Sequence, residues 1–236
     1  MVIFNPDFKS KFIARPNRFI IIAEHNGAEV ICHCPNTGRM KELLYPGADI
    51  ILEKSRNPDR KTLFTVVAVY KGELIVPITS VRANWVAKEL VIPYLYPNSA
   101  ITQEFTYRNS RFDFKIEDHG SPRFIEVKSC TLFEKNHAMF PDAPTTRGLK
   151  HMEELRFAVD EGFKGTVLLI VFNHLAESFS PNYKTDPQFA KTMEAISGKV
   201  DVIPFKVKIN QLGEVTIPIE NPILPLIWGV NDRRFK

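Results

Sequence analysis

Two adjacent strands are predicted between residues 111 and 132, and their pairing constrains the fold more than any other feature. Apolar and polar residues alternate on both sides of the sequence Asp-His-Gly-Ser-Pro at 118–122. This alternation around turn-forming residues is typical of a β-hairpin. If the hairpin is centred between positions 119 and 120, Asp113 lies opposite Glu126. Opposite residues of an antiparallel pair point to the same face, with Cβ atoms about 5 Å apart.

A third predicted strand, at 101–108, extends this pairing, because a turn at 108–109 places Glu104 opposite Asp113. Glu104, Asp113 and Glu126 then form a row of carboxylates across three strands. Like charges opposite each other destabilise a sheet, so this register requires a cation among them. Mg²⁺ (or Mn²⁺) suits carboxylate oxygens, and the row therefore predicts a cation site. Five apolar residues are expected mainly on the other face: Phe105, Phe112, Phe114, Ile125 and Val127.

The composition is that of an ordinary globular protein, and it excludes a membrane span. The 236 residues carry a net charge of +4, which is compatible with a polyanionic partner. No apolar run approaches the roughly 20 residues that a membrane helix requires. Three cysteines do not make a disulfide framework, so we expect a cytoplasmic protein.

Residues 1–80 are predicted to form a small β-barrel. About five strands are separated by turn signals such as Asn26-Gly27, and one short helix is expected at 37–44. This content resembles an OB-fold, which often binds single-stranded nucleic acid. A fold of this kind does not by itself define a function.

Two segments of this barrel are candidates for phosphate binding. Arg15 and Arg18 lie among phenylalanines on the first strand, an arrangement that fits either a phosphate-tracking surface or a solvated barrel face. In the turn that follows Cys34, Asn36, Thr37 and Arg39 could bind an anion at the start of the expected helix. The alternative is that Asn36 or Thr37 only caps that helix.

Residues 81–217 are predicted to form an α/β domain with a mixed sheet, in the order αβββαβ followed by a further helix and strand. Helices are expected at 84–91, 147–161 and 186–198, and the apolar run at 166–172 indicates a central strand covered on both faces. The proline-rich tail, 218–236, ends near Arg233-Arg234. We expect this tail either to pack on the core through Trp228 or to reach a partner.

Lys128 follows Glu126 by two residues on the second hairpin strand and therefore faces the same way. The pattern resembles the PD-(D/E)xK nuclease fold, as does the αβββαβ order. The resemblance implies that Asp113 and Glu126 bind Mg²⁺ and that Lys128 positions or activates a water molecule. The alternative is a solvated charge ladder in which Glu126 and Lys128 pair with Arg111 and Lys115.

Longer motifs between residues 12 and 175 resemble one family, the sugar fermentation stimulation proteins (SfsA). The similar segments are ARPNRF at 14–19, PNTGRMKELLYPG at 35–47, SRFDF at 110–114, FIEVKSCTL at 124–132 and FPDAPTTRGLKHMEEL at 140–155. The resemblance implies an N-terminal OB-like domain followed by a restriction-endonuclease-like domain, with DNA binding as the attributed activity and a link to sugar metabolism. It also favours a functional role for the turn at 35–39.

The sequence therefore predicts a DNA-binding protein with little sequence specificity, regulatory in sugar metabolism. A Mg²⁺-dependent nuclease acting on DNA or RNA is the alternative, and a protein-interaction scaffold is a third. Near the carboxylate row, four further residues are predicted to contact phosphate: Arg111, Arg147, Lys150 and His151.

Overall fold

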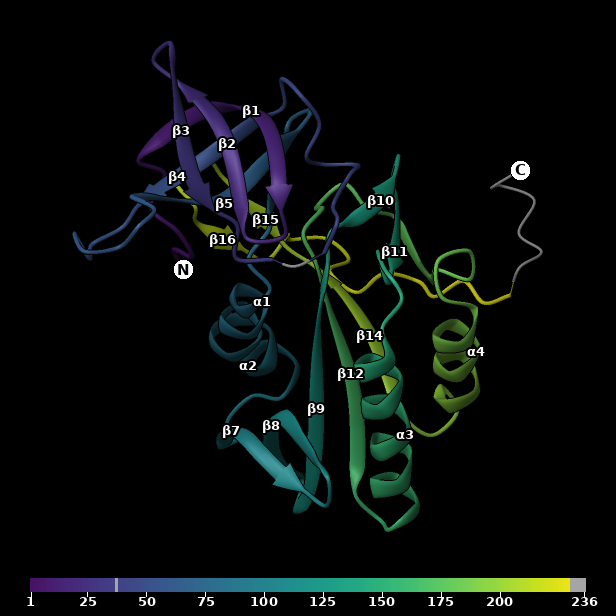
Figure 1. Ribbon diagram of the computed structural model, residues 1–236. Helices are drawn as coiled ribbons and strands as arrows, with labels where there is room; N and C mark the ends of the chain where they lie inside the picture. Colours follow the sequence, from purple (N-terminus) through teal and green to yellow (C-terminus); the bar gives the residue numbers. More distant parts are fainter. Residues whose placement is uncertain (37, 230–236) are drawn as a thin grey trace.

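The N-terminal part of the molecule is a closed β-barrel (Figure 1), in a computed structural model that describes residues 1–36 and 38–229. The strands pair in the order β3-β2-β1-β4-β5-β6, and β3 also pairs with β5, which closes the first five into a barrel. Their bounds are β1 Phe8–Asn17, β2 Ile20–His25, β3 Ala28–His33, β4 Asp49–Lys54, β5 Phe64–Lys71 and β6 Leu74–Pro77. The predicted OB-like architecture is confirmed.

The segment after β3 differs from the sequence prediction, which placed a helix at 37–44. Residues 38–44 form bends and turns instead. Met40 has a φ of 47°, which interrupts a right-handed helical path. Met40, Leu43 and Leu44 are nevertheless buried in the barrel core. The helix-like spacing of these apolar residues therefore reflects burial of one side of a compact loop.

The second part is a mixed five-stranded sheet in the order β14-β12-β9-β8-β7. β12 runs parallel to both β9 and β14, whereas β8 is antiparallel to both β7 and β9. The strands are β7 Ile101–Tyr107, β8 Ser110–Asp118, β9 Ser121–Cys130, β12 Lys164–Val171 and β14 Asp201–Lys206. All residues from position 165 to 171 of β12 are buried, as expected for a central strand.

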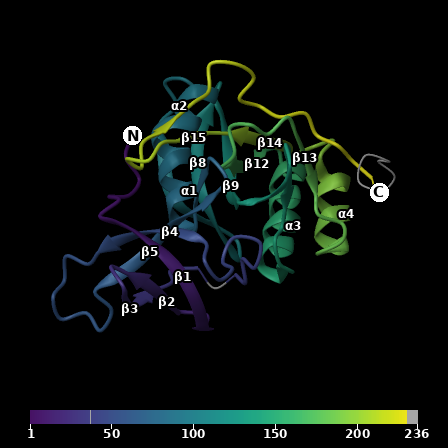
Figure 2. The ribbon, with the colours of Figure 1, turned by 90° about the horizontal axis from the view of Figure 1, so that it is seen from above.

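Helices cover both faces of this sheet. α1 Val81–Val86, the π-helical turn η1 Ala87–Val91 and α2 Ile92–Leu95 lie on one side, and α3 Thr146–Asp160 and α4 Pro187–Ile196 lie on the other (Figure 2). Thr145 caps α3 by accepting a hydrogen bond from the Gly148 N–H, and Asp186 caps α4 in the same way from Phe189. Each helix layer encloses its own apolar cluster against the sheet.

The two predicted hairpin registers are confirmed. Gln103 pairs with Phe114 and Phe105 with Phe112 across β7 and β8, while Phe114 pairs with Ile125 across β8 and β9. The expected distribution of aromatic side chains over the faces is wrong in part. Phe112 and the partly buried Phe105 pack on the α3 side, whereas three other residues, Phe114, Ile125 and Val127, pack on the α1 side.

The change of face occurs where Glu104 would pair with Asp113. Glu104 has a φ of 52°, and neither residue has a paired partner in the β7–β8 ladder. An irregularity of this kind reverses the side-chain alternation that follows it. Period-two counting predicts the register but does not detect this interruption.

Both ends of the described chain pack against the core. The Ile3 N–H donates to the Gly213 carbonyl (2.9 Å), beside the small pair of strands β15 Lys208–Ile209 and β16 Val215–Thr216. In the tail, Trp228 packs on the apolar cluster beneath α3 and α4, whereas Arg233-Arg234 lies outside the described residues.

A further sheet is formed by β10 Leu132–Glu134, β11 His137–Phe140 and β13 Ser178–Pro181. No helix among the described residues is both long and apolar enough to cross a membrane.

Candidate functional site

A cavity of about 420 Å³, here called the central cavity, lies between the barrel and the mixed sheet. Each wall comes from a different part of the chain. The loop after β3 contributes Asn36 and Gly38, α1 contributes Asn84, and the strands β8 and β9 contribute their acidic residues. The wall is completed by the segment before α3 and its first turn. The side chains that concern the site are Asn36, Asn84, Asp113, Glu126, Lys128, Asp142 and Arg147.

Asp113 lies where β8 and β9 stop pairing through their backbones. Its Oδ2 accepts a hydrogen bond from the Val127 N–H (2.8 Å), and its Oδ1 accepts one from the Asn84 side-chain amide (2.7 Å). The carboxylate therefore replaces a strand carbonyl and is fixed from two sides. Burial and the nearby charge of Glu126 raise the pKa of Asp113 above its ordinary value.

Glu126 is 3% exposed and is held by two basic side chains. Its Oε1 accepts from Lys128 Nζ (2.5 Å) and contacts His151 Nδ1, which reaches it from α3. Its Oε2 is buried and has no hydrogen-bond partner among the described residues. Burial alone would raise the pKa of Glu126, but Lys128 and His151 more than offset this and lower the pKa.

A single arginine shapes the barrel wall of the central cavity. The Arg15 guanidinium donates to the backbone carbonyls of Asn36 (2.5 Å), Arg39 (3.1 Å) and Arg18 (2.9 Å), and also to that of Gly38. This fork of hydrogen bonds fixes the loop that faces the acidic residues. A Cβ atom at Gly38 would lie 3.2 Å from Asp142 Oδ2, so the loop approaches the opposite wall closely.

The structure brings Asp113, Glu126 and Lys128 together but places Glu104 elsewhere. The Glu104 side chain is 69% exposed and lies 3.6 Å from Arg111. It does not line the central cavity, because the irregular backbone at this position turns it outward. Among the described residues, no three His, Cys, Asp or Glu side chains are grouped closely enough to form a metal site of their own.

The residues predicted to contact phosphate fall into three groups. Arg147 lines the central cavity, whereas Arg18 and Arg39 are exposed on the barrel. Lys150 donates to the Asn109 carbonyl (2.9 Å) on the surface, and Arg15, Asn36, Arg111 and His151 have the protein contacts described above. Thr37 lies outside the described residues.

Two features of the site were not predicted. Asn84 was not singled out, because its contact with Asp113 depends on how α1 docks on the sheet. His151 was predicted to contact phosphate, yet its side chain is only 7% exposed and contacts Glu126. His151 lies three residues after Gly148 and four before Leu155, both on the buried face of α3; residues at this spacing share a helix face, which is the signal that could have indicated this contact.

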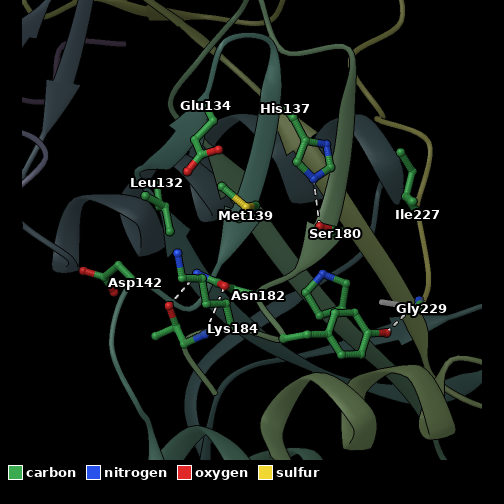
Figure 3. A pocket seen from close by; sticks show the side chains of 13 residues that line it. Leu132, Glu134, His137, Met139, Asp142, Ser180, Asn182, Lys184, Ile227 and Gly229 are labelled. Carbon is green, nitrogen blue, oxygen red and sulfur yellow. Dashed lines mark hydrogen bonds between the residues drawn. The ribbon is translucent and has the colours of Figure 1, made fainter. Parts of the chain in front are cut away.

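A larger cavity of about 620 Å³ lies between the β10–β11–β13 sheet and the tail (Figure 3). His137 projects into this region, where its two ring nitrogens contact the hydroxyls of Ser178 and Ser180, each at 2.8 Å. Asp142 lines both this cavity and the central one. We place the candidate site in the central cavity despite its smaller volume, because the paired acidic residues and Lys128 lie there.

The closed barrel and the mixed sheet define a two-domain protein whose acidic pair faces the domain junction. Comparison with known families agrees: residues 13–78 match the SfsA N-terminal OB domain, and residues 79–213 match the sugar fermentation stimulation protein RE domain. The chain therefore belongs to the sugar fermentation stimulation protein family.

Several relatives support this assignment. A sugar fermentation stimulation protein homolog from Clostridium beijerinckii is 41% identical over 193 residues, covering 81% of this chain and 85% of the relative. A homolog from Desulfitobacterium hafniense is 42% identical over 186 residues, covering 78% and 82%. The solved structure of Pyrococcus furiosus SfsA in complex with Ca²⁺ has a TM-score of 0.82 and 24% identity, covering 96% of this chain and 99% of that one. This last likeness supports the fold.

Proposed function

We propose that this protein binds nucleic acid at the junction of its two domains and hydrolyses phosphodiester bonds there with a divalent cation. One observation carries the proposal: Glu126 Oε2 is buried without a hydrogen-bond partner among the described residues, close to a second acidic residue, Asp113. A buried acceptor of this kind is costly unless a ligand satisfies it. A cation between the two carboxylates would satisfy it and would relieve their repulsion.

The ligand chemistry fits a hard cation such as Mg²⁺ or Mn²⁺. Both side chains offer carboxylate oxygens, and Mg²⁺ commonly uses one or two carboxylates while keeping several waters. The Pyrococcus furiosus relative was solved with Ca²⁺, another cation that prefers oxygen ligands. When bound, such a cation polarises a phosphoryl oxygen and lowers the pKa of a coordinated water.

The surrounding residues have separate tasks in this proposal. Asn84 and the Val127 N–H orient the Asp113 carboxylate, and His151 orients the Glu126 carboxylate. Lys128 holds an ammonium group 2.5 Å from Glu126 Oε1, where it can stabilise negative charge that develops on the phosphate. Arg147, on the cavity wall, can bind a phosphate oxygen.

DNA with little sequence preference is the proposed substrate. The net charge of +4 and the exposed Arg18 and Arg39 supply contacts to phosphates, which are shared by all sequences. Arg18 also lies over the ring of Phe19 (4.8 Å), which is 47% exposed. An exposed aromatic ring beside a cation is suited to stacking on a base.

A DNA-binding protein without turnover, regulatory in sugar metabolism, is the second candidate. The observation that favours it is the pair of contacts on Glu126 Oε1, because the Lys128 ammonium already neutralises part of the charge that a cation would require and His151 occupies the same oxygen. In this case the site would hold a phosphate close to Lys128 without cleaving it.

A cleavage assay with matched variants separates the two candidates. Purified protein is incubated with single- and double-stranded DNA and with RNA, in Mg²⁺, Mn²⁺ or a chelator. We expect cation-dependent cleavage that is lost in Asp113→Asn and retained in Asp118→Asn, a buried acidic residue on the same strand outside the central cavity. Cleavage that persists in Asp113→Asn contradicts the proposed site. Salt-sensitive binding without cleavage in any cation favours the second candidate.

A further inference from the structure

A third cavity, of about 330 Å³, opens on the barrel where β3 ends and β5 begins. We name it the barrel pocket. The end of β4 and the loop that joins β4 to β5 contribute most of its charged side chains, and Thr79 and Arg82, before and within α1, complete it. Six of its lining residues determine its chemistry and its position: His33, Pro35, Lys54, Arg56, Arg60 and Thr79.

The barrel pocket has a surplus of positive charge. Lys54, Arg56 and Arg60 line it, and none of the three forms an ion pair within the described parts of the chain. Arg60 donates one hydrogen bond, to the Thr65 hydroxyl (3.1 Å). The other two charged residues of the pocket, Arg82 and Glu53, form an ion pair (3.1 Å) and neutralise each other. Three cations around one cavity, without counter-ions, favour an anionic ligand.

Two residues that line the same cavity each carry a buried polar atom without a protein partner among the described residues. His33 Nδ1 and the Thr79 hydroxyl are both inaccessible, and neither has a hydrogen-bond partner among residues 1–36 and 38–229. Buried polar groups are nearly always satisfied, by protein or by a bound species. Burial and the charge of Arg60 lower the pKa of His33, so its ring is neutral at pH 7 and can donate one N–H. Neutral donors together with arginines match the oxygens of a phosphate.

The barrel pocket and the central cavity share a thin wall. Pro35 lines the barrel pocket and the adjacent Asn36 lines the central cavity; likewise, Thr79 lines the first and Ser80 the second. Adjacent Cα atoms are about 3.8 Å apart, so the two cavities approach each other at these two segments. A polymer with regularly spaced phosphates is the class of ligand that can present one phosphate to each cavity.

We propose that the barrel pocket binds a backbone phosphate of a nucleic-acid strand that also places a phosphate at Asp113 and Glu126. The inference rests on the proposed function and assigns Arg56, Arg60, Lys54, His33 and Thr79 to it. The pocket fixes the register of the strand relative to the acidic pair. As a phosphate contact of the barrel, the pocket is distinct from Arg18 and Arg39.

The test compares two double variants of the full chain. Arg56→Gln/Arg60→Gln removes two cations from the barrel pocket, and Lys135→Gln/Lys191→Gln removes two exposed cations that line neither cavity. Binding of a fluorescent single-stranded oligonucleotide is measured over a range of salt concentrations in Ca²⁺. We expect the first variant to bind about tenfold more weakly and the slope of log K against log salt to fall by about 0.7 for each phosphate that is no longer bound. The control variant should bind as the wild type does.

Hydrolysis of the small diester bis(p-nitrophenyl) phosphate supplies a readout that the barrel pocket should not affect. This substrate has one phosphate, so the Arg56→Gln/Arg60→Gln protein should cleave it at the wild-type rate while cleaving oligonucleotides more slowly. Equal decreases on both substrates would indicate damage to the central cavity and would overturn the inference.

Failure of this inference can be told from failure of the proposed function. If the wild type binds oligonucleotide and the Arg56→Gln/Arg60→Gln protein binds it with the same affinity and slope, the inference fails and the proposed function stands. If the wild type binds no oligonucleotide, both fail. Titration with inorganic phosphate, followed through the His33 ring signals in NMR spectra, then shows whether the pocket takes a free phosphate instead.

Discussion

The β8–β9 hairpin carries two clusters of buried charged side chains, one near each end, and they differ in how completely their polar atoms are bonded. Near the turn, Asp118 receives hydrogen bonds from Arg123 (2.9 Å) and Lys164 (3.1 Å). Arg123 also donates to the hydroxyl of Thr166 (2.7 Å) and to Asp201 (2.5 Å). At the other end, one oxygen of Glu126 has no partner among the described residues.

The pKa shifts show the same contrast: the acidic residue near the turn is compensated, and the one in the central cavity is not. Burial would raise the pKa of Asp118, but Arg123 and Lys164 more than offset it and lower the pKa. Burial and Glu126 raise the pKa of Asp113. The turn cluster thus balances its charges within the protein, which indicates a structural role. The cluster in the central cavity leaves charge and an acceptor oxygen uncompensated, which is typical of a site that binds a ligand.

The largest expected effect is on the cleavage rate, which a substitution in the central-cavity cluster should reduce and one in the turn cluster should not. Glu126→Gln keeps the shape of the side chain but removes its charge and replaces the unbonded oxygen or its neighbour with an amide. If the proposed hydrolysis is correct, the cleavage rate should fall about a thousandfold, or about 4 kcal/mol in barrier height, because a charge-stabilising element of the site is removed. Asp118→Asn, assayed alongside it by the initial rate of oligonucleotide cleavage, should stay within about twofold of the wild type. Equal decreases would remove the distinction between the clusters.

The second prediction concerns stability, which a substitution in the turn cluster should reduce without reducing the cleavage rate. Arg123→Gln leaves the buried Asp118 with Lys164 (3.1 Å) and the exposed His119 (3.8 Å) as basic neighbours among the described residues. Removing one partner of a buried ion pair is strongly destabilising, and we expect a loss of about 3 kcal/mol in the free energy of unfolding. Denaturant titration measures it. Cleavage per folded molecule should be unchanged, and a stable variant without activity would contradict the structural role.

Cation binding supplies a third, smaller effect. A ligand that binds only the folded state at a hundred times its Kd stabilises that state by about 2.7 kcal/mol. We therefore expect Mg²⁺, Mn²⁺ or Ca²⁺ to raise the thermal unfolding midpoint of the wild type and of Asp118→Asn. Asp113→Asn should show no such rise. A rise of equal size in all three proteins would place the cation elsewhere.

The smallest expected effect concerns pH, where the two aspartates have opposite signs. The stabilisation from Asp118 is complete above its unfolded pKa of about 3.9 and is lost as the pH falls through its lower folded value. For Asp113 the folded pKa is the higher one, so a penalty for ionisation develops as the pH rises from the unfolded value through the folded value. Unfolding free energies measured in chelator should show that Asp118→Asn reduces the loss in acid. Asp113→Asn should reduce the decline above about pH 4. Slopes of the same sign would contradict these pKa directions.

The sequence predicts the hairpin at this site well because its register depends on short turns and on period-two alternation. The pairings of Phe114 with Gln103 and with Ile125 follow from turn positions alone. The family resemblance adds the domain order and the proposed roles of Asp113 and Glu126. The predicted place of Glu104 in the carboxylate row is wrong, because its positive φ is a property of the backbone that a side-chain pattern does not encode.

The remaining differences arise from tertiary contacts. Asn84 and His151 reach the acidic pair from helices on opposite sides of the sheet, and their partners depend on how those helices dock. The compact loop at 38–44 also depends on distant residues, since Arg15 binds its carbonyls. Local spacing alone predicts a helix there, and the barrel core imposes a different path.

The contact between residues 1–4 and the β15–β16 region has a consequence for how the chain folds during synthesis. Ile3 and Phe4 belong to the apolar cluster that includes Val215, and the Val215 N–H donates to the Met1 carbonyl (2.7 Å). At about 5–20 residues per second, roughly ten to forty seconds separate the emergence of these partners from the ribosome. Throughout that interval residues 1–4 lack their partners in β15 and β16, so this contact cannot form until the intervening chain has been synthesised.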